Sequence, residues 1–278
     1  MAEWLNSTSD VLYSAKVVMK NVELVKMSQF DTFNAAVRAV NLKANSFKME
    51  RCSIHSSEGL GMYITNSKGV ELVESVIYKT HRNAIVVRGS ENLVLRDNLI
   101  MNNKPRPWDS SVKGKDFQVA VDICVGEEVV ACKNFLVSGN VATGGAGIGF
   151  TAPVDKCDIE PQFTKNVAHS YEAGWIAHYN EEYGKGHCGS ISDFVAHHNT
   201  DIALQSFFFL ESLTVKRVVI VDNEVGLSLG LGNGDSPLGE IVLEDSLIMG
   251  EHIASQNCQV AQEAGNKKVG LYSSFGIA

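Results

Sequence analysis

Apolar residues recur along this chain in short alternating runs. Three such runs begin at Phe47, Val70 and Leu93, each 23 residues after the one before. Large apolar residues fill the first, third and eighth positions of every run, and a small or amide residue fills the sixth. Alternation over a few residues is typical of a β-strand with one buried face. A fixed period of this length predicts a repeat protein.

The sixth position of the repeat forms a polar column. Stacked coils would place its members at the inter-strand spacing of ~4.8 Å, so each amide can bond to the next. Asn also tolerates the left-handed backbone conformation that a tight bend needs. The predicted column consists of Cys52, Ser75, Asn98, Asn140, Asn166, Asn199, Asn223 and Ser246.

These patterns predict an all-β fold, a right-handed parallel β-helix of the pectin-lyase-like solenoid type with loop insertions. We expect one domain over residues 1–278, with the clearest coils at 45–255, in a fragment or relative of a larger protein. A leucine-rich solenoid has a similar period but needs a fixed Leu framework, which this chain lacks. Other all-β folds remain as alternatives, and residues 34–44 are expected to form either a strand or a short helix.

Three insertions interrupt the period, at residues 103–133, 151–161 and 179–190. Insertions of a solenoid lie on one face and commonly form the binding surface. Four of the six cysteines fall in them, and we expect the disulfides Cys124–Cys132 and Cys157–Cys188. Free thiols in a reducing compartment are the alternative. Because no CxxC pair occurs, a zinc ribbon is not expected.

Charge and hydropathy narrow the classes of partner. The net charge is −8, which argues against nucleic acid because phosphate binding needs a basic face. No run reaches the ~18 apolar residues of a membrane span. The N-terminal residues lack the pattern of a signal peptide. On these grounds the chain is either cytosolic or a piece of a longer secreted protein.

Blocks in the second half of the chain resemble the β-helix region of the fibrocystin and fibrocystin-like family. They are Asn140-Val141-Ala142, Gly147-Ile148-Gly149-Phe150, Cys157, Asn166-Val167-Ala168-His169-Ser170, Gly174-Trp175 and Cys188-Gly189-Ser190-Ile191-Ser192-Asp193-Phe194. The resemblance covers about residues 45–255, and cell-surface hyaluronidases carry a similar helix. It implies a large extracellular, cell-surface or ciliary membrane protein, and it supplies no catalytic residue.

Many parallel β-helices cleave acidic polysaccharides, so catalytic patterns are relevant. Polygalacturonases carry Asn-Thr-Asp, Asp-Asp, Gly-His-Gly and Arg-Ile-Lys on successive coils. Here Asn199-Thr200-Asp201 matches the first pattern, Asp222-Asn223 replaces the second, and the cationic pattern is missing. Hydrolysis needs two suitably separated carboxylates. Asp201, Asp222 and Asp245 are therefore weak catalytic candidates, and a structural role in the column is the favoured interpretation of Asn199.

The position before the column carries several acids. Glu74 is expected to stack on Asp97, and Asp222 on Asp245, at a cost of roughly 1 kcal/mol for each pair in water. Calcium is a possible ligand, because it binds clustered carboxylate oxygens. The alternative is a solvated face with neighbouring cations. No other cofactor is expected.

Histidines and aromatic residues cluster between residues 169 and 198. Aromatic faces bind carbohydrate and His binds zinc, so Trp175, His178, Tyr179 and His198 are candidates for ligand binding. Ordinary surface histidines are the alternative. As neighbours on a strand, His197 and His198 should point to opposite faces.

Two functions fit these observations. The first is a non-catalytic extracellular β-helix module that binds a protein or glycan surface through its insertions. The alternative is a polysaccharide-active enzyme, namely a lyase, a glycoside hydrolase or a relative of the hyaluronidases.

Overall fold

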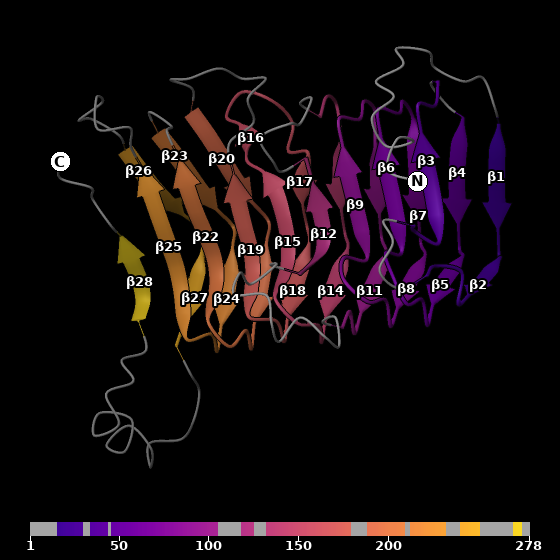
Figure 1. Ribbon diagram of the computed structural model, residues 1–278. Helices are drawn as coiled ribbons and strands as arrows, with labels where there is room; N and C mark the ends of the chain where they lie inside the picture. The colour runs from indigo at the N-terminus through magenta and orange to yellow at the C-terminus, as the bar shows by residue number, and fades with distance from the viewer. Residues whose placement is uncertain are drawn as a thin grey trace.

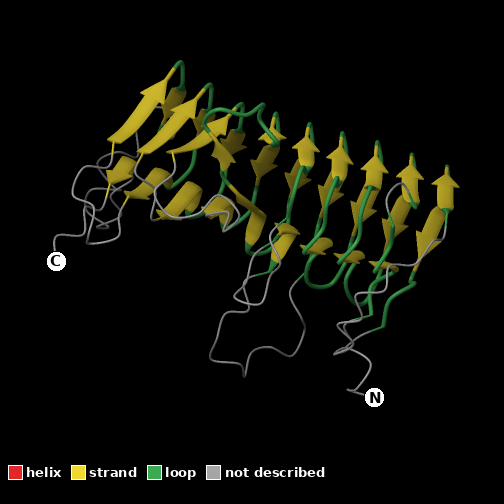
Figure 2. Cartoon of the chain, turned by 90° about the horizontal axis from the view of Figure 1, so that it is seen from above, coloured by secondary structure: helices red, strands yellow, loops and turns green. Residues whose placement is uncertain are grey.

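The computed structural model describes residues 16–29, 34–43, 46–104, 118–124, 132–178, 188–208, 212–231, 240–250 and 269–273. Within these residues every regular element is a β-strand, and the strands wind into a parallel β-helix (Figure 1). Each coil contributes one strand to each of three sheets, so the sheets run along the whole helix. Figure 2 shows the coils stacked in a single row.

The first sheet has a six-stranded N-terminal part and a four-stranded C-terminal part. The N-terminal part contains β1 (Val17–Lys20), β4 (Phe47–Glu50), β7 (Val70–Val73), β10 (Val94–Arg96), β13 (Leu136–Ser138) and β17 (Phe163–Thr164). The C-terminal part contains β16 (Asp155–Lys156), β20 (Cys188–Ser192), β23 (Ser212–Lys216) and β26 (Glu240–Glu244). Strand β16 runs antiparallel to β20, and the other pairs are parallel.

The second and third sheets have nine parallel strands each. The second sheet contains β2 (Glu23–Val25), β5 (Ser53–His55), β8 (Val76–Tyr78), β11 (Leu99–Met101), β14 (Val141–Thr143), β18 (Val167–His169), β21 (Val195–His197), β24 (Val219–Val221) and β27 (Leu247–Met249). The third contains β3 (Val37–Val40), β6 (Met62–Thr65), β9 (Ile85–Arg88), β12 (Val119–Ile123), β15 (Ile148–Pro153), β19 (Ala173–His178), β22 (Ile202–Phe208), β25 (Val225–Leu231) and β28 (Val269–Ser273).

These bounds settle two expectations from the sequence. The segment at residues 34–44 contains the strand β3 and no helix in its described part. The insertions are shorter than expected, because strands of the β-helix occupy part of each one. Strand β12 lies inside the first, β15 and β16 extend into the second, and β20 begins in the third.

Two bends flank the second sheet, and each places one residue per coil in the left-handed region. The first bend, which enters the sheet, holds Asn21, Arg51, Glu74, Asp97, Gly139, Lys165, Asp193, Arg217 and Asp245. The second bend, which leaves it, holds Lys26, Ser56, Lys79, Asn102, Gly144, Ser170, His198 and Asp222. At both bends the following residue points inward, so each bend creates its own internal column.

Hydrogen bonds confirm a ladder along the first bend. The Oδ1 atom of Asn140 accepts bonds from the backbone N and the Nδ2 of Asn98, at 3.1 and 2.9 Å. The Oδ1 of Asn166 accepts the same two bonds from Asn140, both at 3.0 Å. The ladder extends backward through Ser75, whose backbone N donates to Asn98, and Cys52, whose backbone N donates to Ser75.

The predicted column was wrong at Asn199 and Asn223. Strand β18 pairs with β21 so that Val167 lies beside Val195, which places Phe194 rather than Asn199 in line with Asn166. Asn199 and Asn223 belong to the second bend, where the backbone N and the Nδ2 of Asn199 both donate to Asn223 Oδ1. Because both bends combine a left-handed residue with an inward polar one, the two columns have the same local pattern.

The interior widens around an aromatic cluster in the middle of the chain. Trp175 is fully buried and stacks on Phe163, with ring centroids 4.1 Å apart. Phe194 packs edge to face against Trp175, and Phe150 packs edge to face against Phe163. Its indole Nε1 donates to the carbonyl of Ala152 at 3.3 Å. Glycine precedes Phe150 and Trp175 on their strands. A Cβ atom at position 174 would lie 2.4 Å from the carbonyl oxygen of Ala203, so glycine is required there.

Replacing Asn140 with Ala is expected to lower the free energy of unfolding by on the order of 3 kcal/mol. The change leaves the buried donors of Asn98 without their acceptor, and each such loss costs about 1–3 kcal/mol. Urea unfolding followed by circular dichroism measures the effect. Ser138→Ala in the same coil is the control, because that side chain lies on the outer face. Equal stability of the two variants would contradict the role of the ladder.

Candidate functional site

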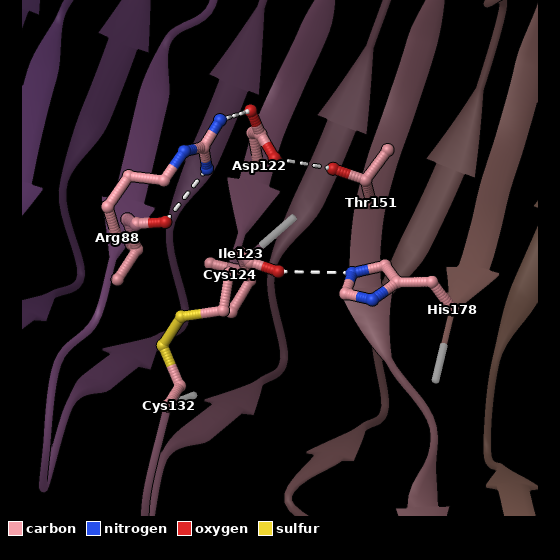
Figure 3. The surroundings of a disulfide bond; sticks show 8 residues. Arg88, Asp122, Ile123, Cys124, Cys132, Thr151 and His178 are labelled. Atoms are coloured by element: carbon pink, nitrogen blue, oxygen red, sulfur yellow. Dashed lines mark hydrogen bonds and ion pairs between the residues drawn. A yellow bond between two sulfur atoms is a disulfide. The ribbon is translucent and has the colours of Figure 1, made fainter. Parts of the chain in front are cut away.

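Disulfides brace the helix near two of the insertions. Cys124 bonds to Cys132, 8 residues later, and Cys157 bonds to Cys188, 31 residues later. Beside the first bond, on the third sheet, Arg88 forms an ion pair with the buried Asp122 at 2.6 Å, and Thr151 Oγ1 donates to the other oxygen of that carboxylate at 2.8 Å (Figure 3). Both oxygens of the Asp122 carboxylate have partners, so we infer that this cluster stabilises the coil.

The four residues predicted to bind a ligand do not form one site. The prediction that Trp175 binds a ligand was wrong, because its ring fills the core and has no exposed surface. His178 bonds through Nε2 to the carbonyl of Ile123 at 3.2 Å, beside the disulfide (Figure 3). Tyr179 lies outside the described residues. His198 is exposed and lies on the second bend, where the chain enters the third sheet, whereas His178 lies at the end of the third-sheet strand β19.

His198 belongs instead to a cluster of three imidazoles. The rings of His169 and His197 stack with centroids 4.5 Å apart and planes 10° from parallel. His197 Nδ1 lies 2.9 Å from His198 Nδ1, and His198 Nε2 lies 3.6 Å from the carboxylate of Asp222. The expectation of opposite faces was wrong, because β21 ends at His197 and the left-handed turn at His198 brings the two rings together.

The cluster has a distinct electrostatic character. Partial burial lowers the pKa of His169, and the nearby His198 lowers it further. Partial burial also lowers the pKa of His197, with contributions from both neighbouring imidazoles, while Asp222 opposes this effect. The Nδ1 of His169 additionally contacts the hydroxyls of Thr143 and Ser170, at 3.1 and 3.2 Å. The neutral imidazoles are therefore favoured.

A surface depression of about 450 Å³ lies next to this cluster, where the second bend leads into the third sheet. Its described wall combines three hydroxyl-bearing residues, two carboxylates and three small residues, and none of these residues is cationic. The lining residues are Gly145, Ala146, Gly147, Ser170, Tyr171, Glu172, Thr200 and Asp201. Tyr171 is buried and is held in place by its hydroxyl, which donates to Asn103 Oδ1 at 2.7 Å. This depression is the candidate functional site.

The three acids considered for catalysis are not brought together. Asp201 lines the depression, and Asp222 contacts His198 on the second bend. Asp245 lies on the first bend, at the opposite edge of the second sheet, so the expected stacking of Asp222 on Asp245 was wrong. Glu74 and Asp97 do follow one another on the first bend. The error has the same cause as the misplaced asparagines, since the two bends look alike in sequence.

In the described part of the chain, no three His, Cys, Asp or Glu side chains are arranged to hold a metal ion. The imidazole cluster illustrates the reason. Two of its nitrogens face each other, and others contact hydroxyls or a carboxylate.

Asp155 is the described carboxyl whose pKa burial raises most, although no pattern in the sequence singled it out. It is 2% exposed, and its oxygens accept bonds from the backbone N of Gln162 and Phe163 at 3.0 and 3.2 Å. Burial raises its pKa to about 7, against the opposing effect of those two bonds. Because the carboxyl is enclosed and fixes the turn before β17, it cannot act on an external substrate.

Comparison with known proteins identifies the class. Residues 11–183 match the family described as the right handed beta helix region. That match covers more than half of the chain, so the chain belongs to this family, which confirms the handedness expected from the sequence.

A more particular relationship lies within that class. The chain is a distant homologue of fibrocystin from Mus musculus, with 25% identity over 219 residues. The match covers 77% of this chain but 5% of the length of fibrocystin. The family resemblance inferred from the sequence is thereby confirmed. No helix with the length and apolar content of a membrane span occurs in the part of the chain that the structure describes.

The imidazole cluster is expected to make stability fall as the pH drops below about 6.5. In the unfolded chain His169 and His197 take up protons at an ordinary pKa of 6.5, whereas in the folded chain the pKa values of these two residues are lower. The stability is therefore present above pH 6.5 and is lost on acidification. Urea midpoints from pH 7.5 to 5 should vary less in His197→Gln. The control Met101→Gln, in the same outer column, should retain the wild-type slope, and an identical loss of slope there would contradict the assignment.

Asp155 is expected to act with the opposite sign. Its pKa is raised from 3.8 to about 7, so its favourable contribution is complete below pH 3.8 and is lost as the pH rises through about 7. Relative to wild type, Asp155→Asn should gain stability between pH 4 and 7, by as much as about 4 kcal/mol at 1.4 kcal/mol per unit. Asp193→Asn is the control, because Arg217 lowers the pKa of Asp193. A pH-independent difference for Asp155→Asn would contradict the prediction.

Proposed function

We propose that this chain is a non-catalytic, extracellular β-helix module that binds a neutral glycan in the depression at the second bend. The observation that carries the proposal is the chemistry of the lining. Ser170 and Thr200 offer hydroxyls, Glu172 and Asp201 offer carboxylates, and none of the described lining residues is cationic. Carboxylates accept hydrogen bonds from sugar hydroxyls, and hydroxyls can donate to them or accept from them.

The same lining disfavours acidic polysaccharides. A uronic acid would bring its carboxylate against Asp201, and like charges at about 4–5 Å repel by roughly 1 kcal/mol even in water. Lyases and hydrolases of acidic polymers need cations at such a position, and the enzymatic alternative lacks this support. The described carboxyl whose pKa burial raises to about 7 belongs to Asp155, which is enclosed and lies away from the depression.

An extracellular location is supported by two features. Disulfides such as Cys124–Cys132 and Cys157–Cys188 persist mainly in oxidising compartments. The homology with fibrocystin, of which this chain spans a small part, points in the same direction. The candidate site lies at the second bend, before the start of β19, whereas the insertion that begins at residue 179 follows the end of that strand.

A panel of neutral and acidic oligosaccharides tests the proposal by calorimetry. Neutral sugars should bind more tightly than acidic ones, and Asp201→Asn should weaken binding about tenfold or more, since a bond to a charged group is worth about 1.5–3 kcal/mol. The control Asp245→Asn removes an exposed carboxylate at the other edge of the sheet and should bind like wild type. Preferential binding of acidic sugars, or unchanged affinity in Asp201→Asn, would overturn it.

The enzymatic alternative needs a separate assay. The protein is incubated with a polysaccharide panel, with and without Ca²⁺, and products are followed by chain length and by the absorbance of unsaturated ends. Cleavage that Asp201→Asn abolishes would replace the binding proposal with an enzyme. Intact polymers together with measurable binding would support the module.

A further inference from the structure

The outer face of the second sheet carries an unbroken aliphatic column. In the second-sheet strands from β8 to β27, the first residue points outward, because the middle residue of each three-residue strand faces the interior. Strand register aligns these residues in one line. They are Val76, Leu99, Val141, Val167, Val195, Val219 and Leu247.

The neighbouring outward column combines apolar residues with Tyr, Thr and His. It consists of the last residue of each strand from β5 to β27, namely His55, Tyr78, Met101, Thr143, His169, His197, Val221 and Met249. Neither column contains Asp, Glu, Lys or Arg over this range. We call the two columns together the apolar face.

The first sheet shows how an outer face of this same helix looks when it meets water. Its outward residues include charged pairs, with Lys20 3.2 Å from Glu50 and Lys48 3.0 Å from Glu71, beside the apolar Val18, Val94 and Leu136. The apolar face instead leaves Val219, Leu247 and Met249 exposed by 37, 48 and 43%. It forms the lower edge of the helix in Figure 1, from β5 to β27. Extended exposed apolar patches mark interaction sites.

The size of the apolar face suits a protein interface. Eight strands at ~4.8 Å extend roughly 35 Å, and the strand with its two bends is about 15 Å wide at ~3.3 Å per residue. The flat area is therefore on the order of 500 Å² on each partner, which gives about 1,000 Å² for the pair, the lower limit for a specific interface.

We propose that the apolar face binds a second copy of this chain, around a two-fold axis parallel to the helix axis. Charge complementarity selects this occupant. Such an axis places the first bend of one copy over the second bend of the other at the same coil. The residue at each first bend then faces the residue that lies five positions later on the second copy. Glu74 meets Lys79 of the second copy, and Arg217, which also pairs with Asp193 of its own chain at 2.7 Å, meets Asp222 of the second copy.

The remaining coils are consistent with this arrangement. Asp193 meets the imidazole of His198 of the second copy, and no coil opposes two like charges. The other pairs are Asn21 with Lys26, Arg51 with Ser56, Asp97 with Asn102, Gly139 with Gly144, Lys165 with Ser170, and Asp245 with Gly250. Opposite charges at the rim set register and orientation, while the aliphatic column supplies the buried area.

Sedimentation equilibrium of the 278-residue chain tests the proposal, from about 1 to about 200 µM. We expect a monomer–dimer equilibrium that Val141→Lys weakens at least tenfold. The matched control is Leu136→Lys, which makes the same change at the outer face of the first sheet in the same coil. Urea unfolding confirms that both variants are folded. A chain that stays monomeric at the highest concentration would overturn the proposal, as would equal weakening by both variants.

Charge reversal tests the orientation. Glu74→Lys would oppose two lysines at each symmetric contact and should weaken the dimer several-fold, more at low salt than at high salt. The double variant Glu74→Lys with Lys79→Glu restores the complementarity and should restore the affinity. A dimer that ignores Glu74→Lys, or that the double variant fails to restore, would overturn the proposed two-fold axis. Binding of a monomeric chain to a different domain of a longer protein would identify another occupant.

Discussion

The stacking of one coil on the next is the constraint on which the rest of this structure depends. Each strand satisfies its backbone groups almost entirely through strands of the adjacent coils, as in other solenoids where a repeat contacts only its neighbours. The chain must therefore turn at the same positions in every coil. It does so with a left-handed residue at each bend, including lysines, glutamates and aspartates that tolerate this conformation less readily than glycine. At bends such as those before Asn98, Asn140 and Asn199, the inward polar residue that follows closes the bend by bonding to the coil beside it.

This constraint also distributes chemistry over the surface. Every outward position becomes a column that repeats at the inter-strand spacing, so a single residue type in the repeat becomes an extended stripe. The same rule produces the paired imidazoles of His169 and His197, the aliphatic line through Val141, and the carboxylates of Glu172 and Asp201. A solenoid thus forms its surfaces by addition along the axis, whereas a globular domain assembles them from distant segments. The depression at the second bend arises where small residues at 145–147 interrupt such a stripe.

Much of the fold follows from the repeat, but the candidate site follows from it only in part. The 23-residue offset and the first-bend ladder at Asn98, Asn140 and Asn166 were both predictable, because regular coils retain their register. The later coils were misaligned, since Asn199 and Asn223 satisfy the second bend with the pattern already seen at the first. A signal that resolves the ambiguity was present: Val-Ala-His occurs at 167–169 and again at 195–197, and the structure pairs these segments.

The sequence by itself determined the architecture, because its period, its alternation and its Asn column leave few ways to satisfy the backbone. It also placed the cysteines that the structure joins. Only the tertiary structure decided which side chains share a surface. Strand alternation placed Trp175 inside, the assignment to different bends separated Asp222 from Asp245, and the left-handed turn at His198 brought its ring against that of His197. The distances and enclosure that perturb Asp155 likewise exist only once the coils are stacked, since burial is a property of neighbours that are remote in sequence.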